Sequence, residues 1–125
     1  MKVIGIVGTR KRTSKKDYDQ IREWLFNDAY DEGDMLCSGG CPLGADKFAH
    51  RIAKEVGIPI IIYYPDWKKY GKGAGMVRNT KIAEHSDILI ACVTKDRTGG
   101  TEDTIKKFKK LGKDTGDNLI ILGEE

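Results

Sequence analysis

The fold is indicated first by one glycine-rich segment, Ser38-Gly39-Gly40-Cys41-Pro42-Leu43-Gly44-Ala45-Asp46. A short apolar run, residues 35–37, precedes it, and an amphipathic segment, residues 47–56, follows it. This order predicts a strand, a glycine turn and a helix. Paired glycines let a ligand approach the main chain, and a helix start presents unpaired N–H groups and the positive end of a dipole. The segment is therefore either an ordinary strand-to-helix connection or part of an anion site.

Five apolar runs predict five strands. The run over residues 2–7 is nearly continuous and rich in β-branched residues, which is typical of a strand buried on both faces of a sheet. The others cover residues 35–37, 58–63, 87–93 and 118–122. Helical patterns alternate with these runs, so the strands are joined by crossovers and should be parallel. We therefore predict an α/β fold in a single domain, residues 1–125: a Rossmann-like, doubly wound sheet with strand order 3-2-1-4-5 and helices on both faces.

Some boundaries can also be predicted. Asp17 is expected to cap the first helix, and Trp24 is expected on the buried side of that helix. Val56 belongs to the apolar stripe of the second helix, and Gly57 is expected to end it. Residues 64–75 should form the longest loop, which by its length is expected to be functional or mobile.

The composition is that of one globular domain with a well-solvated surface. Hydrophobic residues make up 39% and charged residues 33% of the 125 residues, and the formal net charge is +3 at pH 7. So small a charge does not by itself favour nucleic acid as a partner. No apolar run approaches the roughly 20 residues needed to span a bilayer, and no signal-peptide pattern is present, so no membrane partner is expected. Cys37 and Cys92 lie in apolar runs as expected buried thiols, which indicates a reducing cytoplasm.

Three glycine-bearing turns follow strands that the predicted order places side by side. They are Gly8-Thr9-Arg10, residues 38–46 and residues 94–101. Ligands of such sheets bind beyond the carboxyl ends of the strands, where the winding reverses, so the three turns should meet at one pocket. Together they are a more specific indication of a ligand site than any one of them alone.

Charged and polar side chains near these turns are the candidate ligand-binding groups. Arg10 offers a rigid guanidinium fork suited to phosphate, although it also begins a basic, solvated run. Arg78 could reach a second phosphate, and Asn79 could bond to a ribose or a base edge, while each alone is typical of a helix surface. Asp46 would repel phosphate, so it should face sugar hydroxyls or a reacting centre.

Further residues have both a functional and a structural interpretation. Glu102 and Asp103 favour a helix start through its dipole, and they are also the catalytic candidates if the protein is an enzyme. Thr101 could donate to a phosphate or cap the same helix. Trp67 could stack on a base or pack beneath its loop, and packing is the preferred interpretation. No cluster with metal-ligand spacing is present, so neither a metal nor a cofactor is expected.

Short motifs run through nearly the whole chain. They are Gly8-Thr9-Arg10, Ser38-Gly39-Gly40, Gly44-Ala45-Asp46, Pro65-Asp66-Trp67, Tyr70-Gly71, Ala74-Gly75, Arg78-Asn79 and Gly99-Gly100-Thr101. In order and spacing they resemble the SLOG superfamily, in particular its small YspA/YpsA-related proteins, and the motifs over residues 65–79 are the most specific. The resemblance implies a Rossmann-like domain that binds nucleotides or nucleotide derivatives.

The superfamily includes cytokinin-activating phosphoribohydrolases, the DNA-processing protein DprA, and sensor domains for ADP-ribose-like signals in antiphage defence. The phosphoribohydrolases carry a Pro-Gly-Gly-x-Gly-Thr-x-x-Glu motif, whereas residues 97–101 here are shorter and lack the proline. Neither Glu102 nor Asp103 can be equated with that catalytic glutamate. The residues expected to bind the ligand are Gly8, Thr9, Arg10, Ser38, Gly39, Gly40, Gly44, Asp46, Trp67, Arg78, Asn79, Gly99, Gly100 and Thr101.

The leading hypothesis is that the protein binds a nucleotide-derived small molecule, either ADP-ribose-like or a nucleoside phosphate, and senses or sequesters it. One alternative is an N-glycosidic or phosphoribosyl hydrolase acting on nucleoside monophosphates. Another is single-stranded nucleic-acid binding through Trp67 and neighbouring lysines, which the modest net charge disfavours. Relatives often pair through helices, so a homodimer or a higher homo-oligomer is compatible with the resemblance.

Overall fold

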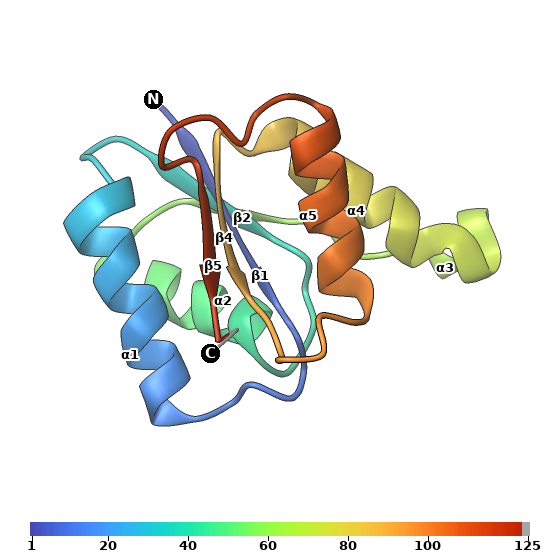
Figure 1. Ribbon diagram of the computed structural model, residues 1–125, viewed down its shortest axis with the longest axis horizontal. Helices are drawn as coiled ribbons and strands as arrows, with labels where there is room; N and C mark the ends of the chain where they lie inside the picture. Colours follow the sequence, from blue (N-terminus) through green and yellow to red (C-terminus); the bar gives the residue numbers. More distant parts are fainter. Residues whose placement is uncertain (124–125) are drawn as a thin grey trace.

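A parallel sheet lies between two pairs of helices in the computed structural model, which describes residues 1–123 (Figure 1). The strands are β1 (Val3–Gly8), β2 (Met35–Ser38), β3 (Ile60–Ile62), β4 (Ile88–Cys92) and β5 (Leu119–Leu122). They follow the order β3-β2-β1-β4-β5, and every neighbouring pair is parallel. The predicted fold class and strand order are confirmed.

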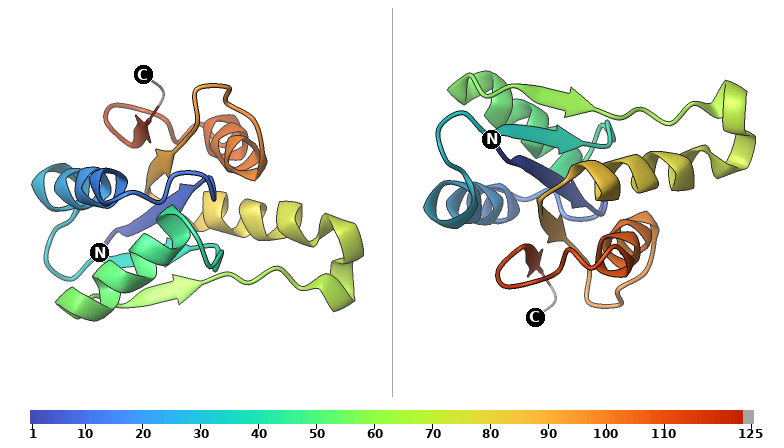
Figure 2. Two further views of the ribbon diagram at one scale, coloured as in Figure 1. Left: turned by 90° about the horizontal axis from the view of Figure 1, so that it is seen from below. Right: turned by 90° about the horizontal axis from the view of Figure 1, so that it is seen from above.

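Helices cover both faces of the sheet. They are α1 (Lys15–Trp24), which continues into the π-helix η1 (Leu25–Ala29), α2 (Ala45–Val56), α3 (Trp67–Tyr70), the 3₁₀ helix η2 (Gly71–Gly73), α4 (Ala74–His85) and α5 (Gly100–Lys110). Helices α1 and α2 pack on one face, and α4 and α5 on the other (Figure 2). The short helix α3 lies away from the sheet, at the outer end of α4 (Figures 1 and 2).

The core has two parts because side chains of β1 point alternately to the two faces of the sheet. Ile4 and Ile6 join the cluster beneath α1 and α2, whereas Val3 and Val7 join the cluster beneath α4 and α5. Phe108 of α5 is fully buried in the second cluster. This packing holds the carboxyl ends of β1 and β4 in fixed positions.

Four predictions about α1 and α2 can be compared with the structure. The cap of α1 is Ser14, whose hydroxyl accepts from the Asp17 N–H at 3.1 Å, so the prediction that Asp17 is the cap was wrong. Asp17 instead completes the capping box by accepting from the Ser14 N–H. Trp24 and Val56 were expected to be buried, but both lie at helix ends and are 38% and 43% exposed. Gly57 ends α2 as predicted.

The loop predicted over residues 64–75 contains regular structure. Asp66 caps α3 by accepting a hydrogen bond from the Lys69 N–H at 3.1 Å, and η2 then leads directly into α4. Aspartate commonly caps the start of a helix, but the many glycines that follow Asp66 led to the prediction of a loop. The longest loop is therefore mostly helical.

The cysteines of the described chain are free thiols that differ in burial. Cys37 and Cys92 are buried free thiols, as predicted, and Cys41 is half-buried. Burial raises the pKa of Cys37 to about 11.

In the part of the chain that the structure describes, no helix has the length and apolar character required to cross a bilayer.

Asp34 joins the amino ends of β1 and β2. Its carboxylate accepts hydrogen bonds from the N–H groups of Lys2 at 2.8 Å and Asp31 at 2.9 Å, and it pairs with Lys2 Nζ at 2.9 Å. Burial by itself raises the pKa of Asp34, but these bonds outweigh it and lower the pKa from 3.8 to about 2. A lowered pKa in the folded state stabilises the fold above the ordinary pKa, and this contribution is lost as the pH falls from about 4 towards 2.

We expect Asp34→Asn to lower the free energy of unfolding by about 2 kcal/mol near neutral pH, at roughly 1.4 kcal/mol per pKa unit. Urea denaturation near pH 7 and near pH 2 measures this, and the difference between variant and parent should shrink at acid pH. Asp31→Asn is the matched control, because this exposed carboxylate also pairs with Lys2 but should contribute less than about 1 kcal/mol. An equal loss at both pH values would exclude the charge of Asp34 as the source.

Candidate functional site

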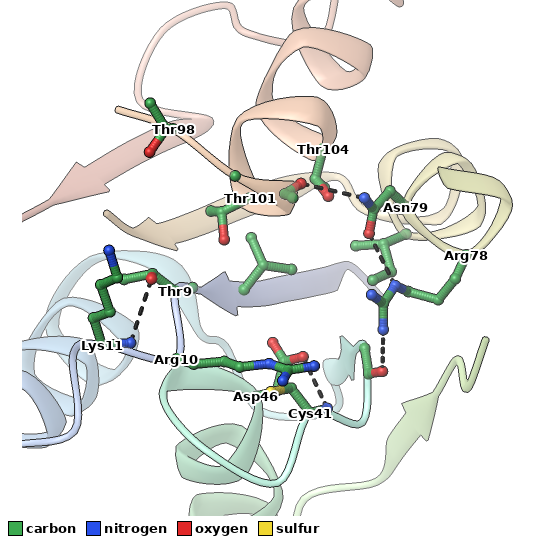
Figure 3. Close-up of a pocket in the computed structure, with 16 residues that line it drawn as sticks. Thr9, Arg10, Lys11, Cys41, Asp46, Arg78, Asn79, Thr98, Thr101 and Thr104 are labelled. Carbon is green, nitrogen blue, oxygen red and sulfur yellow. Dashed lines mark hydrogen bonds between the residues drawn. The ribbon is translucent and has the colours of Figure 1, made fainter. Parts of the chain in front are cut away.

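A pocket of about 350 Å³ lies at the carboxyl ends of β1 and β4, where the winding of the sheet reverses (Figure 3). Open α/β sheets bind their ligands at this position, and the volume is in the range of small-molecule sites. The pocket is built from the end of β1, the loop after β2, helix α4 and the loop that leads into α5. Its lining residues are Val7, Gly8, Thr9, Arg10, Lys11, Gly39, Cys41, Asp46, Arg78, Asn79, Ile82, Thr98, Gly99, Gly100, Thr101 and Thr104.

The structure brings the three glycine-bearing turns together around this pocket, as their positions after neighbouring strands predicted. The residues singled out from the sequence that line it are Gly8, Thr9, Arg10, Gly39, Asp46, Arg78, Asn79, Gly99, Gly100 and Thr101. Those that do not line it are Ser38, Gly40, Gly44, Trp67, Glu102 and Asp103.

Ser38, Gly40 and Gly44 shape the loop beside the pocket without lining it. The Ser38 hydroxyl is buried and donates to a carbonyl oxygen of β1 at 2.6 Å. A Cβ atom at Gly40 would lie 2.6 Å from the Tyr64 ring, and one at Gly44 would lie 2.4 Å from the Thr9 carbonyl oxygen. Close packing against Tyr64 and Thr9 therefore explains why glycine is present at positions 40 and 44.

Arg10 presents its guanidinium to the pocket. The residue is exposed, and among residues 1–123 its side chain makes no hydrogen bond or ion pair. Figure 3 shows this side chain extended towards Asp46 and Cys41. The next residue, Lys11, also lines the pocket. The donors of Arg10 are thus available to an anion at this position.

Arg78 and Asn79 connect two of the glycine turns across the pocket. Nη1 of Arg78 donates to the Gly39 carbonyl oxygen, and its Nε donates to Asn79 Oδ1 at 2.9 Å. The Asn79 amide donates to the Gly100 carbonyl oxygen at 3.2 Å and to the Asp103 carboxylate at 3.1 Å. Both amide protons are used within the protein, so Asn79 positions Arg78 and the start of α5.

Asp46 is the one carboxylate among the lining residues. It is buried, with 8% exposed, and its Oδ2 accepts a hydrogen bond from the Cys41 N–H at 3.1 Å. Burial raises the pKa of Asp46, and the Cys41 N–H and the charges of Arg78 and Arg10 offset this effect only in part. The pocket therefore holds a partly desolvated carboxylate between two guanidinium groups.

Two helices begin at the pocket without a side-chain cap. The N-cap of α2 is Gly44 and that of α5 is Gly99, and neither supplies a side chain to the first-turn N–H groups. The first turns of both helices contribute to the pocket lining, through Asp46 of α2 and through Gly100 and Thr101 of α5, so the positive ends of both helix dipoles lie near it. Together with Arg10, Lys11 and Arg78, they make an environment that favours an anion.

Glu102 and Asp103 are engaged in ion pairs outside the pocket lining. The Glu102 carboxylate accepts from Arg97 Nε at 2.7 Å and from Nη2 at 3.0 Å. The Asp103 carboxylate accepts from Lys107 Nζ at 2.9 Å as well as from Asn79. These contacts support the structural interpretation of both residues at the start of α5.

Trp67 lies on α3, outside the pocket lining, and is 60% exposed. The prediction that it packs beneath its loop was wrong, because the segment forms its own helix and contributes no buried residue. Lys68 and Lys69 flank it on the same short helix.

Several lining residues were not found from the sequence. Lys11 had been assigned to a solvated basic run, although its position directly after Arg10 was a usable signal. Thr104 follows Thr101 by three residues on α5, the spacing at which side chains share a helix face. Thr98 and Cys41 lie within glycine-rich turns, where nothing in a single sequence distinguishes a lining residue from its neighbours.

Residues 1–123 contain no group of three or more histidine, cysteine or acidic side chains placed to share a metal ion. Comparisons with protein-family models, with curated proteins and with solved structures found no match to this chain.

Proposed function

We propose that the pocket binds a phosphate-bearing nucleotide derivative, either a nucleoside phosphate or an ADP-ribose-like molecule, which the protein senses or sequesters. One observation supports this proposal most directly. The first turns of α2 and α5, neither of which has a side-chain cap, and the cationic side chains of Arg10, Lys11 and Arg78 contribute to one pocket. Among residues 1–123, the Arg10 guanidinium makes no hydrogen bond or ion pair. Preorganised N–H groups and an available guanidinium are the groups that bind phosphate in proteins. The resemblance to the SLOG superfamily favours the same ligand class.

The shape of the pocket favours a ligand larger than inorganic phosphate. A volume of about 350 Å³ exceeds what a single phosphate group fills and is at the lower end of small-molecule sites. Its lining also includes the apolar side chains of Val7 and Ile82 and the hydroxyl groups of four threonines. A ligand that joins a phosphate to a sugar, or to a sugar and a base, could contact the cationic, apolar and hydroxyl side chains of the lining.

We expect Arg10→Ala to weaken the binding of ADP-ribose or nucleoside monophosphates by about tenfold to a hundredfold, because it removes charge-assisted hydrogen bonds to phosphate. Isothermal titration calorimetry measures the change. Lys54→Ala is the matched control, because Lys54 is an exposed cation at the far end of α2 and should leave the affinity unchanged. Equal affinities of parent and Arg10→Ala would contradict the role of Arg10.

Cys41 offers an independent measurement at the same pocket. It is the half-buried thiol of the described chain, while the other two cysteines are buried, so alkylation by iodoacetamide should modify it first. A ligand that fills the pocket should slow this alkylation. Unchanged alkylation at saturating nucleotide would place the binding site elsewhere.

Chromatography of the same mixtures distinguishes binding from hydrolysis. Recovery of intact nucleotide after long incubation supports a binding protein. Release of free base would identify an N-glycosidic hydrolase instead, and the pocket carboxylate to test would then be Asp46, because Glu102 and Asp103 are held in ion pairs.

A further inference from the structure

We infer that the pocket recognises its ligand through a free ribose diol, and that the carboxylate of Asp46 is the group that selects ribose over 2′-deoxyribose. This inference rests on the proposed function and specifies the ligand class further. It makes Asp46 a specificity-determining residue of the pocket.

The position of Asp46 within a cationic pocket carries the inference. Asp46 is more than nine-tenths buried and lines the pocket, and the charges of Arg78 and Arg10 both act on its carboxylate. A Cβ atom at Gly39 would lie 2.9 Å from its Oδ2 and 2.8 Å from Arg78 Nη1, so a side chain at this position would displace these two charged groups.

The carboxylate retains hydrogen-bonding capacity. A carboxylate offers about four acceptor positions, and one is used by the Cys41 N–H at 3.1 Å. The neighbouring Ser38 hydroxyl has one proton, which it donates to the Ile6 carbonyl oxygen at 2.6 Å. At least two acceptor positions of Asp46 are therefore available to donors on a ligand.

The chemistry of this environment excludes phosphate as the direct partner of Asp46. A phosphate oxygen against a carboxylate has no proton to donate and is repelled, so phosphate groups belong with Arg10, Arg78 and the helix starts. The partner of Asp46 must be a hydrogen-bond donor close to a phosphate. In a nucleotide the sugar is bonded directly to the phosphate, whereas the base is one group further away.

A vicinal diol fits this requirement. Two adjacent hydroxyl groups can donate to the two oxygens of one carboxylate, and acidic residues bind the ribose 2′-hydroxyl in dinucleotide-binding folds. A site built to accept a hydroxyl hydrogen bond discriminates strongly against an analogue that lacks the hydroxyl, because a buried acceptor is then left unpaired. Asn79 cannot substitute, since its amide protons are donated to Gly100 and Asp103.

The test compares the four nucleoside 5′-monophosphates with their 2′-deoxy counterparts, by calorimetric titration of the protein. We expect the ribonucleotides to bind about tenfold or more tightly, whatever the base. In Asp46→Asn this preference should fall to within about threefold. The asparagine retains an oxygen that can accept from the Cys41 N–H, and Asp46→Glu provides a second variant that keeps the charge but moves it.

Each result bears on one claim. Equal binding of ribonucleotides and deoxynucleotides by the parent protein would overturn the inference and leave the proposed function intact. A ribose preference that survives in Asp46→Asn and Asp46→Glu would overturn the role of Asp46. Failure of every nucleotide and of ADP-ribose to bind would overturn the proposed function itself. A preference that changes with the base would show that Asp46 reads the base edge and would also overturn the inference.

Discussion

Replacing Gly44 with alanine should lower the free energy of unfolding by about 4 kcal/mol and abolish the pocket. Gly44 has φ +79° and ψ −153°, a backbone region that is essentially restricted to glycine and costs other residues about 1–3 kcal/mol. The added Cβ would also lie 2.4 Å from the Thr9 carbonyl oxygen, so the first and second turns of the site would have to separate. Chemical denaturation and the affinity for ADP-ribose measure the two effects.

Gly99→Ala is the control that separates strain from collision. Gly99, at the start of α5, has φ +101° and ψ −170°, but no atom lies within 4 Å of its Cβ position. It should therefore show the conformational cost alone, about 1–3 kcal/mol. If Gly44→Ala proves no more damaging than Gly99→Ala, the contact between Gly44 and Thr9 is not what holds the two turns together.

Replacing Asn79 with alanine should lower the free energy of unfolding by about 3 kcal/mol and weaken nucleotide binding, although Asn79 has no amide proton left for a ligand. The change removes its hydrogen bonds with Arg78, Gly100 and Asp103. Arg78 then keeps only its bond to Gly39, and Asp103 keeps only its bond to Lys107, so these partly buried groups are less well satisfied. Asn79→Ala therefore removes the side chain that links the Arg78 guanidinium to the first turn of α5 by hydrogen bonds. Urea denaturation and calorimetric titration measure stability and affinity on the same samples.

Thr80→Ala is the matched control for Asn79→Ala. Thr80 is the next residue of α4, and its hydroxyl bonds only to the Met76 carbonyl oxygen of its own helix at 3.0 Å. Its removal should change the stability by less than about 0.5 kcal/mol and leave the affinity unaltered. A loss of affinity in Thr80→Ala equal to that in Asn79→Ala would indicate a general disturbance of α4 in place of a specific link.

The sequence was most informative where chain direction alone decides position. Apolar runs that alternate with helical patterns specify parallel strands, and the carboxyl ends of parallel strands lie at one edge, so the turns after β1, β2 and β4 could be placed together. The same reasoning located Arg10, because it directly follows β1. These conclusions depend on periodicity and connectivity and not on side-chain contacts.

The sequence was least informative where the same residue type can contact either a ligand or another part of the protein. Asn79 was predicted to bond to a ligand, and the structure shows a further use, because its amide links Arg78 to the start of α5. Helical spacing does not reveal which neighbour lies opposite a side chain. Gly44 was grouped with the ligand-binding residues because a glycine that admits a ligand and one that admits the Thr9 carbonyl look alike in sequence. Trp67 was misplaced because its loop forms a separate helix.

The pocket draws on residues from Val7 to Thr104, contributed by four separate parts of the chain. Its ligand can therefore bind only the folded protein, and by mass action it should raise the melting temperature of the entire domain. A ligand at a hundred times its dissociation constant would add about 2.7 kcal/mol to the unfolding free energy. A thermal-shift screen of a metabolite library can thus search for the natural ligand with no assumption about which atoms it presents.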